Sequence, residues 1–246
     1  MKTRPALFIL AFLLLGSFSA NAEQVKDGFG KAQLPDGSVY EGNFKSGLFN
    51  GHGVLRYGNG DRYEGEFKDG LLNGKGVWAG IYGDKYEGEC KNGYREGKAT
   101  FTFRSGEKYE GEYERGYWKK GVFTRTDGAQ YDGEFKGTVF HGKGTLYYSN
   151  GNQKYEGEFK DGKKNGYGIM YEGDMKIAGE FKDDYLNGKA AITFPDGDVF
   201  NGDCWNGPDH CKGVLTEKDG KKTEYEKENW SKLLIEKTRE SLSAKS

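Results

Sequence analysis

The chain has 246 residues, of which 41 are Gly and only 4 are Pro, and its formal net charge at pH 7 is -1. This near-neutral balance argues against a nucleic-acid-binding protein and against electrostatic attraction to an anionic membrane. The 17 Tyr and 16 Phe, set among so many glycines in a chain that is only 35% hydrophobic, are typical of a repeat sheet with little deep interior.

Residues 1–22 are predicted to be a cleaved secretory signal peptide. Lys2 and Arg4 precede the apolar run from Ala6 to Leu15, and small residues stand at Ala20-Asn21-Ala22. The apolar run is too short for a membrane-spanning helix, whereas the three regions together match a leader sequence. We therefore expect an exported protein, periplasmic or secreted, whose mature chain starts near residue 23.

From residue 23 to residue 222 one unit recurs, and its plainest copy is YEGEFKDGKKNGYG, which starts at Tyr155. A fixed period of this size predicts a repeat architecture. A half repeat covers residues 23–39, and eight full copies follow at intervals of 22 to 24 residues, beginning at Tyr40, Tyr63, Tyr86, Tyr109, Tyr131, Tyr155, Ile177 and Phe200.

Each copy is predicted to be a β-hairpin. Counting positions from zero at the first residue, YEGEFK places aromatic, Gly and Phe residues on one face and Glu, Glu and Lys on the other, which is strand periodicity. A Gly-rich connection, LLNG or KKNG, leads to a second apolar segment with Gly or Ala at position 13, and Asn-Gly or Asp-Gly pairs then supply tight turns. Gly at positions 2 and 13 lets an aromatic ring lie flat on the backbone, because no Cβ intervenes.

Residues 223–246 lack the glycines of the repeats and are predicted to form a helical tail. Trp230, Leu233 and Leu234 follow at i, i+3 and i+4, and Asn229 is placed to cap a short amphipathic helix. This helix is expected either to cap the last hairpin or to bind a partner.

The units YEGEFKDGLLNGKG and YEGEFKDGKKNGYG resemble the MORN repeat, the membrane occupation and recognition nexus, whose hallmark is Tyr-Glu-Gly, an aromatic residue two positions on, and spaced glycines. The resemblance extends roughly from Gly28 to Gly220. It implies an elongated, twisted, single-layer antiparallel sheet of tandem hairpins, in agreement with the all-β fold that the periodicity predicts. For function it implies a protein-binding scaffold, a dimerising rod or a binder of membrane phospholipid.

No catalytic, cofactor-binding or metal-binding residue is predicted. Phosphate-loop and Cys/His metal motifs are absent from the sequence, and His52, His141 and His210 belong to separate hairpin connections. The Glu residues at positions 1 and 3 resemble the paired acids of glycosidases, but every copy carries an acidic residue at one or both positions and most have Lys at position 5, so a solvated, charge-balanced face is expected.

The aromatic face is the predicted binding surface, because a single-layer sheet has no second layer to cover it. Its rings are expected either to pack on one another or to line a groove for a peptide, a helix or a sugar ring. We expect a non-catalytic scaffold that binds another protein or macromolecule, the alternative being a module for lipid headgroups or cell-envelope glycan, with homo-oligomers left open. The candidate residues are Tyr63, Phe67, Trp78, Phe101, Phe103 and Phe123.

Cys204 and Cys211 occupy positions 4 and 11 of the last copy. If paired positions sum to 15, the two residues are directly opposite, with Cα atoms about 4.5 to 5.5 Å apart and within reach of a disulfide. Export would supply an oxidising compartment. We therefore predict a disulfide between Cys204 and Cys211, with Cys90 left as a buried free thiol.

Overall fold

The computed structural model describes residues 26–225 together with residues 232, 233, 235 and 237. The predicted signal peptide and most of the predicted helical tail lie outside the described residues. The elements of the described part are 18 β-strands, so the all-β class is confirmed. Within the same part, no helix has the length and hydropathy needed to cross a bilayer.

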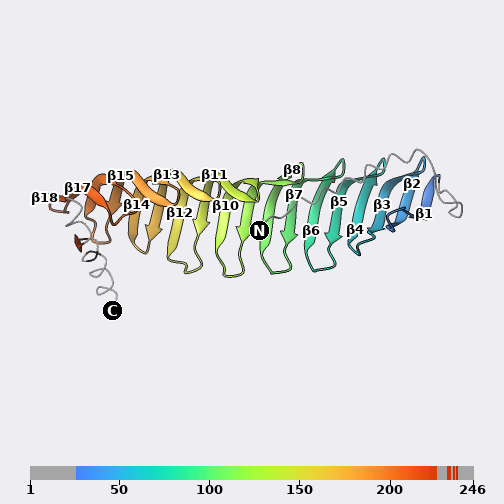
Figure 1. Cartoon of the computed structure of the whole chain (residues 1–246), viewed down its shortest axis with the longest axis horizontal. Coiled ribbons are helices and arrows are strands. Elements are labelled where there is room, and N and C mark those ends of the chain that lie inside the picture. The colour runs from blue at the N-terminus through green and yellow to red at the C-terminus, as the bar shows by residue number, and fades with distance from the viewer. Residues whose placement is uncertain (1–25, 226–231, 234, 236, 238–246) are drawn as a thin grey trace. The chain divides into compact units, whose positions relative to one another are not determined.

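The chain divides into two compact units, residues 1–126 and residues 127–246. In each unit every strand pairs antiparallel with its neighbours in the sequence, as a sheet of tandem hairpins requires (Figure 1). The strands of unit 1 are β1 (Gly28–Gln33), β2 (Val39–Lys45), β3 (Leu48–Arg56), β4 (Arg62–Lys68), β5 (Leu71–Ala79), β6 (Lys85–Lys91), β7 (Tyr94–Thr102), β8 (Lys108–Glu114) and β9 (Tyr117–Thr124).

Unit 2 repeats the arrangement, and its sheet ends one strand later than predicted. The segment Lys222–Tyr225 forms a strand against β17, so residues assigned to the helical tail extend the sheet instead. The strands are β10 (Gln130–Gly137), β11 (Val139–Tyr147), β12 (Gln153–Lys160), β13 (Lys163–Glu172), β14 (Met175–Lys182), β15 (Tyr185–Thr193), β16 (Val199–Cys204), β17 (Cys211–Thr216) and β18 (Lys222–Tyr225).

The core of most hairpins is the ring at position 0 lying over the two glycines at positions 2 and 13. Tyr40 is fully buried, and its hydroxyl donates to the carbonyl oxygen of Asn43 at 2.9 Å. The paired glycines Gly42 and Gly53 lie beneath the ring, and a Cβ on Gly53 would stand 2.6 Å from Cε2 and Cζ of Tyr40. Steric exclusion by the ring therefore explains why glycine recurs at these positions.

The Gly-rich connections predicted at LLNG and KKNG are not loops. Both segments belong to strands, β5 and β13, and the tight turn comes two residues earlier. In the first case Asp69 and Gly70 have φ angles of 50° and 82°. Positive φ at two successive residues is the requirement of the type I′ hairpin turn.

The straight register, in which position 4 faces position 11, is wrong for the first seven full hairpins. In β4 and β5, Gly65 pairs with Gly76, but the next inward pair is Phe67 with Leu72. Gly74, which has a φ of 104°, lies in the stretch of β5 between these two pairs, where the register with β4 shifts. The carboxylate of Glu66 lies against this glycine and accepts the backbone N–H of Lys75 at 3.4 Å. Glu at position 3 therefore supports a bulge, a role beyond that of a solvated charge.

The last full hairpin keeps the straight register. Cys204 pairs directly with Cys211, their Cα atoms are 4.1 Å apart, and a disulfide joins them. Position 11, which is a positive-φ glycine in most copies, is a cysteine here, so the bulge cannot form in the same way. Cys90 is a buried free thiol.

Beyond residue 225, the structure describes residues 232, 233, 235 and 237 of the tail. Leu233 is buried. The Nζ atom of Lys237 donates to Asp198 at 2.6 Å and also to Asp196, both in the turn before β16. Burial alone would lower the pKa of Lys237, but the hydrogen bonds that Lys237 donates to the two carboxylates outweigh burial and raise it.

Candidate functional site

The six residues predicted for the binding surface all lie on the aromatic face of unit 1, but they differ in exposure. Tyr63, Phe67 and Phe101 are buried. Trp78 and Phe103 are only half-buried, as is Phe123. The first three rings therefore form the packed layer of the sheet, and the last three are the ones that a partner could reach.

The half-buried rings belong to a continuous row. Trp78 stacks near Phe101 at a centroid distance of 6.4 Å, and Phe101 contacts Phe103 at 4.7 Å. Phe103 in turn contacts Trp118 at 6.1 Å and Phe123 at 6.3 Å. We call these five residues the aromatic row. Because each ring is held by its neighbours, little side-chain freedom is left to lose when a partner binds.

Arg95 lies beside the aromatic row, and the sequence patterns did not single it out. It occupies position 9, on β7, and its guanidinium carbon lies 4.8 Å from the ring centroid of Tyr86, 5.0 Å from that of Phe101 and 5.6 Å from that of Trp78. Burial lowers the pKa of Arg95. The signal that could have revealed it is a charge at a position where Phe49, Leu72 and Trp118 stand in the other full hairpins of unit 1.

Cys90 and its tyrosine neighbours are the titratable groups under this part of the face. Burial raises the pKa of the Cys90 thiol to about 11, and burial also raises the pKa of Tyr86. Both groups therefore stay protonated at neutral pH. A nucleophile or a general base would need the opposite shift.

Unit 2 repeats the combination of a cation and rings at the same position of the repeat. Lys164, on β13, is half-buried, and its Nζ atom lies 5.5 Å from the ring centroid of Tyr155 and 5.7 Å from that of Phe181. It also lies 5.9 Å from the ring of Tyr148 and donates to the Tyr148 hydroxyl at 3.3 Å.

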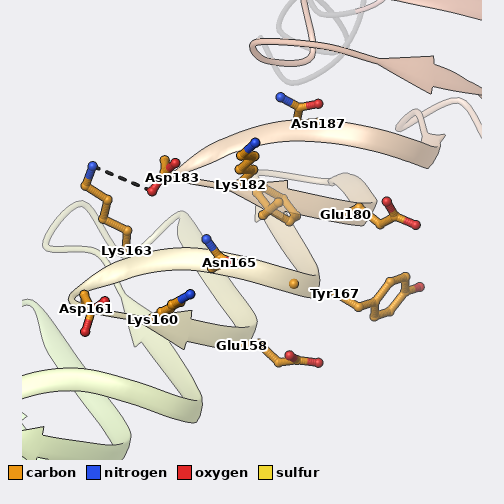
Figure 2. Close-up of a pocket in the computed structure, with 12 residues that line it drawn as sticks. Glu158, Lys160, Asp161, Lys163, Asn165, Tyr167, Glu180, Lys182, Asp183 and Asn187 are labelled. Carbon is orange, nitrogen blue, oxygen red and sulfur yellow. Dashed lines mark ion pairs between the residues drawn. The ribbon is translucent and has the colours of Figure 1, made fainter.

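The opposite, polar face of unit 2 carries an open groove of about 910 Å³ across the hairpins of copies six and seven. Figure 2 shows Glu158, Glu180 and Tyr167 extending at one end of this groove, with the ion pair between Lys163 and Asp183 at the other. Matching side chains recur from one hairpin to the next. The groove is lined by Glu158, Lys160, Asp161, Lys163, Asn165, Gly166, Tyr167, Glu180, Phe181, Lys182, Asp183 and Asn187.

The described residues contain no group of three or more His, Cys, Asp or Glu side chains placed to hold a metal ion. His52 and Glu64 approach each other at 3.7 Å, and His141 and Asp161 at 4.0 Å, in different hairpins. The histidines are therefore not brought together.

Comparison with solved structures finds likenesses at low sequence identity, among them the following three. The TCP domain of SAS-4 from Drosophila melanogaster, solved with a proline-rich motif of Ana2, is 13% identical, with 86% of this chain and 97% of that chain covered and a TM-score of 0.34. A catalytically inactive virginiamycin B lyase from Staphylococcus aureus with quinupristin is 13% identical, with coverage of 83% and 71% and a TM-score of 0.17. A streptogramin B lyase is 12% identical, with coverage of 80% and 67% and a TM-score of 0.16.

No curated protein matches the sequence at a significant level. The family model of the MORN repeat, in contrast, matches six segments, which together cover more than half of the chain: residues 40–62, 63–80, 86–108, 131–153, 155–174 and 178–199. The copies that start at Tyr109 and Phe200 fall outside these segments, although both form hairpins of the same sheet type. The chain belongs to the MORN repeat family.

Proposed function

We propose that this chain is an exported, non-catalytic scaffold that binds another protein through its aromatic face. The observation that carries the proposal is the aromatic row of unit 1, in which Trp78, Phe103 and Phe123 are half-buried beside Arg95. Tryptophan, tyrosine and arginine are the residues that most often dominate binding energy at protein interfaces. Rings that are already fixed by packing lose little entropy on binding.

Three features support export and the lack of catalysis. The first 22 residues have the order of charged, apolar and small residues that leaders share, and a disulfide between Cys204 and Cys211 persists in oxidising compartments. The raised pKa of Cys90 leaves its thiol unreactive at neutral pH. Because the repeats occupy most of the chain, purified mature protein should transfer no radioactive phosphate to a phosphoinositide above an inactivated control.

The binding surface can be tested by photo-crosslinking. A photoreactive residue at position 103 should capture a protein in the native compartment, and the partner identified in this way should then bind the purified chain. Phe103→Gln should weaken that binding by tenfold or more, which corresponds to about 1.4 kcal/mol. Tyr117→Gln, on the opposite face of the same unit, is the matched control. Equal loss in both variants, or in neither, would contradict the assignment to the aromatic face.

A second candidate is glycan binding by the polar groove of unit 2. The groove combines an exposed ring, Tyr167, with amides and carboxylates that recur in consecutive hairpins (Figure 2). Hairpins follow one another at about twice the strand spacing of 4.8 Å, which suits a ligand that is itself a repeating polymer. Sedimentation with cell-envelope glycan, lost in Tyr167→Ala and Asn187→Ala, would favour this candidate.

Lipid headgroups are the least favoured ligand, since a net charge of -1 gives little attraction to an anionic bilayer. Sedimentation with anionic liposomes at near-physiological salt should therefore be weak. Binding that is strong and falls as salt rises would favour the lipid alternative.

The tail is proposed to cap the last hairpins, as a short helix whose apolar residues pack on unit 2. The burial of Leu233 and the contacts from Lys237 to Asp196 and Asp198 support capping over partner binding. Deletion of residues 229–246 should lower the melting temperature and promote association through the exposed end. Unchanged melting would favour the partner-binding alternative.

A further inference from the structure

Position 9 of the repeat normally carries an apolar side chain that stacks on the ring at position 0. Phe49 lies 3.8 Å from Tyr40 between ring centroids, and Phe140 lies 3.9 Å from Tyr131, with interplanar angles of 13° and 10°. Leu186 is fully buried at the same position. Packing of the sheet therefore favours an apolar residue at position 9.

Copies three and six place a cation in this apolar slot. Arg95 lies over Tyr86, and Lys164 lies over Tyr155, where the other five copies with the shifted register place a ring or a leucine. The charge adds nothing that the packing of the sheet needs, because the other copies fold without it. Attraction to the ring faces offsets only part of the free-energy cost of removing each charge from water.

The Lys164 ammonium group has room for one more hydrogen-bond acceptor. Its ammonium group contacts the Tyr148 hydroxyl at 3.3 Å and the Met170 sulfur at 3.9 Å. Asp184 accepts the backbone N–H of Lys164 at 2.9 Å, but no carboxylate among the described residues forms an ion pair with its Nζ atom. An ammonium group has three donors, so hydrogen-bonding capacity remains for an incoming acceptor.

The surroundings of Lys164 indicate which anion fits. Half-buried Tyr148 and Met170 contact the ammonium group, and half-buried Leu146 pairs with Tyr155 on the same face. A phosphate or sulfate dianion is usually held by several cations or N–H groups, whereas a single cation between apolar walls suits a single carboxylate on an apolar carrier. An Asp or Glu side chain set among apolar side chains of a polypeptide has this chemistry.

We propose that Lys164 is a carboxylate-recognition point on the aromatic face, and that Arg95 is its counterpart in unit 1, so that each unit binds an apolar polypeptide segment through an acidic side chain. The inference rests on the proposed function, because it names the chemistry of the partner that the aromatic face would bind. The site selects partners because the charge of Lys164 must be neutralised within an apolar contact, so neutral segments bind less well.

The test uses peptides selected against the full mature chain from a random display library. Selected peptides should carry Asp or Glu beside aromatic or aliphatic residues, and replacing that acid by its amide should weaken binding about tenfold or more. Lys164→Met, which keeps the length of the side chain but removes the charge, should abolish the preference for the acid in peptides that bind unit 2. Arg95→Met should do the same in unit 1, and Lys189→Met, on the polar face, should change neither.

The outcomes separate the inference from the function on which it rests. Peptides that bind the aromatic face equally well as acid and as amide would overturn carboxylate recognition and leave the scaffold proposal intact. Selection that yields no peptide bound to the aromatic face would overturn both. Lys164→Met should leave the melting temperature unchanged or raise it, so a clear fall would assign Lys164 a structural role and overturn the inference. Equal binding of inorganic phosphate and of the acidic peptides would show a site for free anions instead.

Discussion

Gly168→Ala should destabilise unit 2 because the ring of Tyr155 occupies the space that a side chain would need. Tyr155 is fully buried, and a Cβ on Gly168 would stand 2.5 Å from Cε2 and Cζ of its ring. Gly168 is not among the glycines with positive φ, so backbone strain does not explain its identity. Forcing extra volume into a packed core costs about 1 to 3 kcal/mol.

Displacing the ring would also disturb its polar and aromatic contacts. The Tyr155 hydroxyl donates to the carbonyl oxygen of Glu158 at 3.2 Å, a bond whose loss costs about 1 kcal/mol. The ring meets Phe159 and Phe181 edge to face at 5.2 Å and 5.0 Å. The substitution should therefore cost about 2 to 4 kcal/mol in the free energy of unfolding.

Copy seven contains a compatible pair that supplies the rescue. There Ile177 stands at position 0 and Ala190 at position 13, and both are buried. Adding Tyr155→Ile to Gly168→Ala should therefore cost at least about 1 kcal/mol less than the two single substitutions together. Tyr155→Phe, which keeps the ring, should give no such rescue.

Urea unfolding of the full chain, followed by circular dichroism and by hydrogen exchange in β12 and β13, measures these differences. Exchange assigns the loss to the mutated hairpin, because unfolding of a repeat array need not be all-or-none. Additivity of the two substitutions within about 0.5 kcal/mol would refute the steric account. A loss of less than about 0.5 kcal/mol in the free energy of unfolding for Gly168→Ala alone would also refute the steric account.

Three further outcomes are expected. Replacing both Cys204 and Cys211 by Ser should lower stability by roughly 2 to 3 kcal/mol, as chain entropy predicts for so short a loop, and alkylation of both thiols without reduction would contradict the disulfide. Glu66→Ala should cost about 0.5 to 1 kcal/mol because it removes the support of the bulge, whereas Glu64→Ala, in an exposed ion pair, should cost almost nothing. Lys237→Gln should lower the melting temperature at neutral pH. Because the folded pKa of Lys237 is raised, its contribution to stability is present below its unfolded pKa and is lost as pH rises through the folded pKa. A difference between variant and wild type that persists at strongly alkaline pH would contradict the ion pair.

The alternation of YEGEFK was enough to predict which side chains share a face. Tyr40 and Phe44 are both buried, while Glu41 and Lys45 are exposed, because strand geometry admits only a two-residue period. The half repeat was predictable on the same ground, and Gly30 of β1 indeed pairs with Gly42 of β2. Faces follow from local pattern, so a single sequence contains the information.

Register within the hairpins did not follow from that pattern. In six of the seven shifted hairpins position 11 is a glycine with positive φ, as at Gly51 and Gly166, and a glycine in a sequence does not reveal the sign of its φ. The straight register held only where Cys211 replaces this glycine. The same limit explains why Arg95 and Lys164 were missed, since position 9 had been assigned to a connection rather than to a strand.

The bulge is what places position 9 on the aromatic face. With a straight register position 9 would lie beside the turn, as Asp209 does between β16 and β17, but the bulge brings it opposite position 4, so that Phe140 faces Phe135 and Lys164 faces Phe159. The glycine at position 11 and the Glu at position 3 that lies against it therefore have two roles. They set the strand pairing of the hairpin, and they place the cation on the aromatic face. A substitution at Gly166 that removed the bulge would move the charge of Lys164 away from Tyr155 without altering either residue, which is why stability and partner selection are coupled in this sheet.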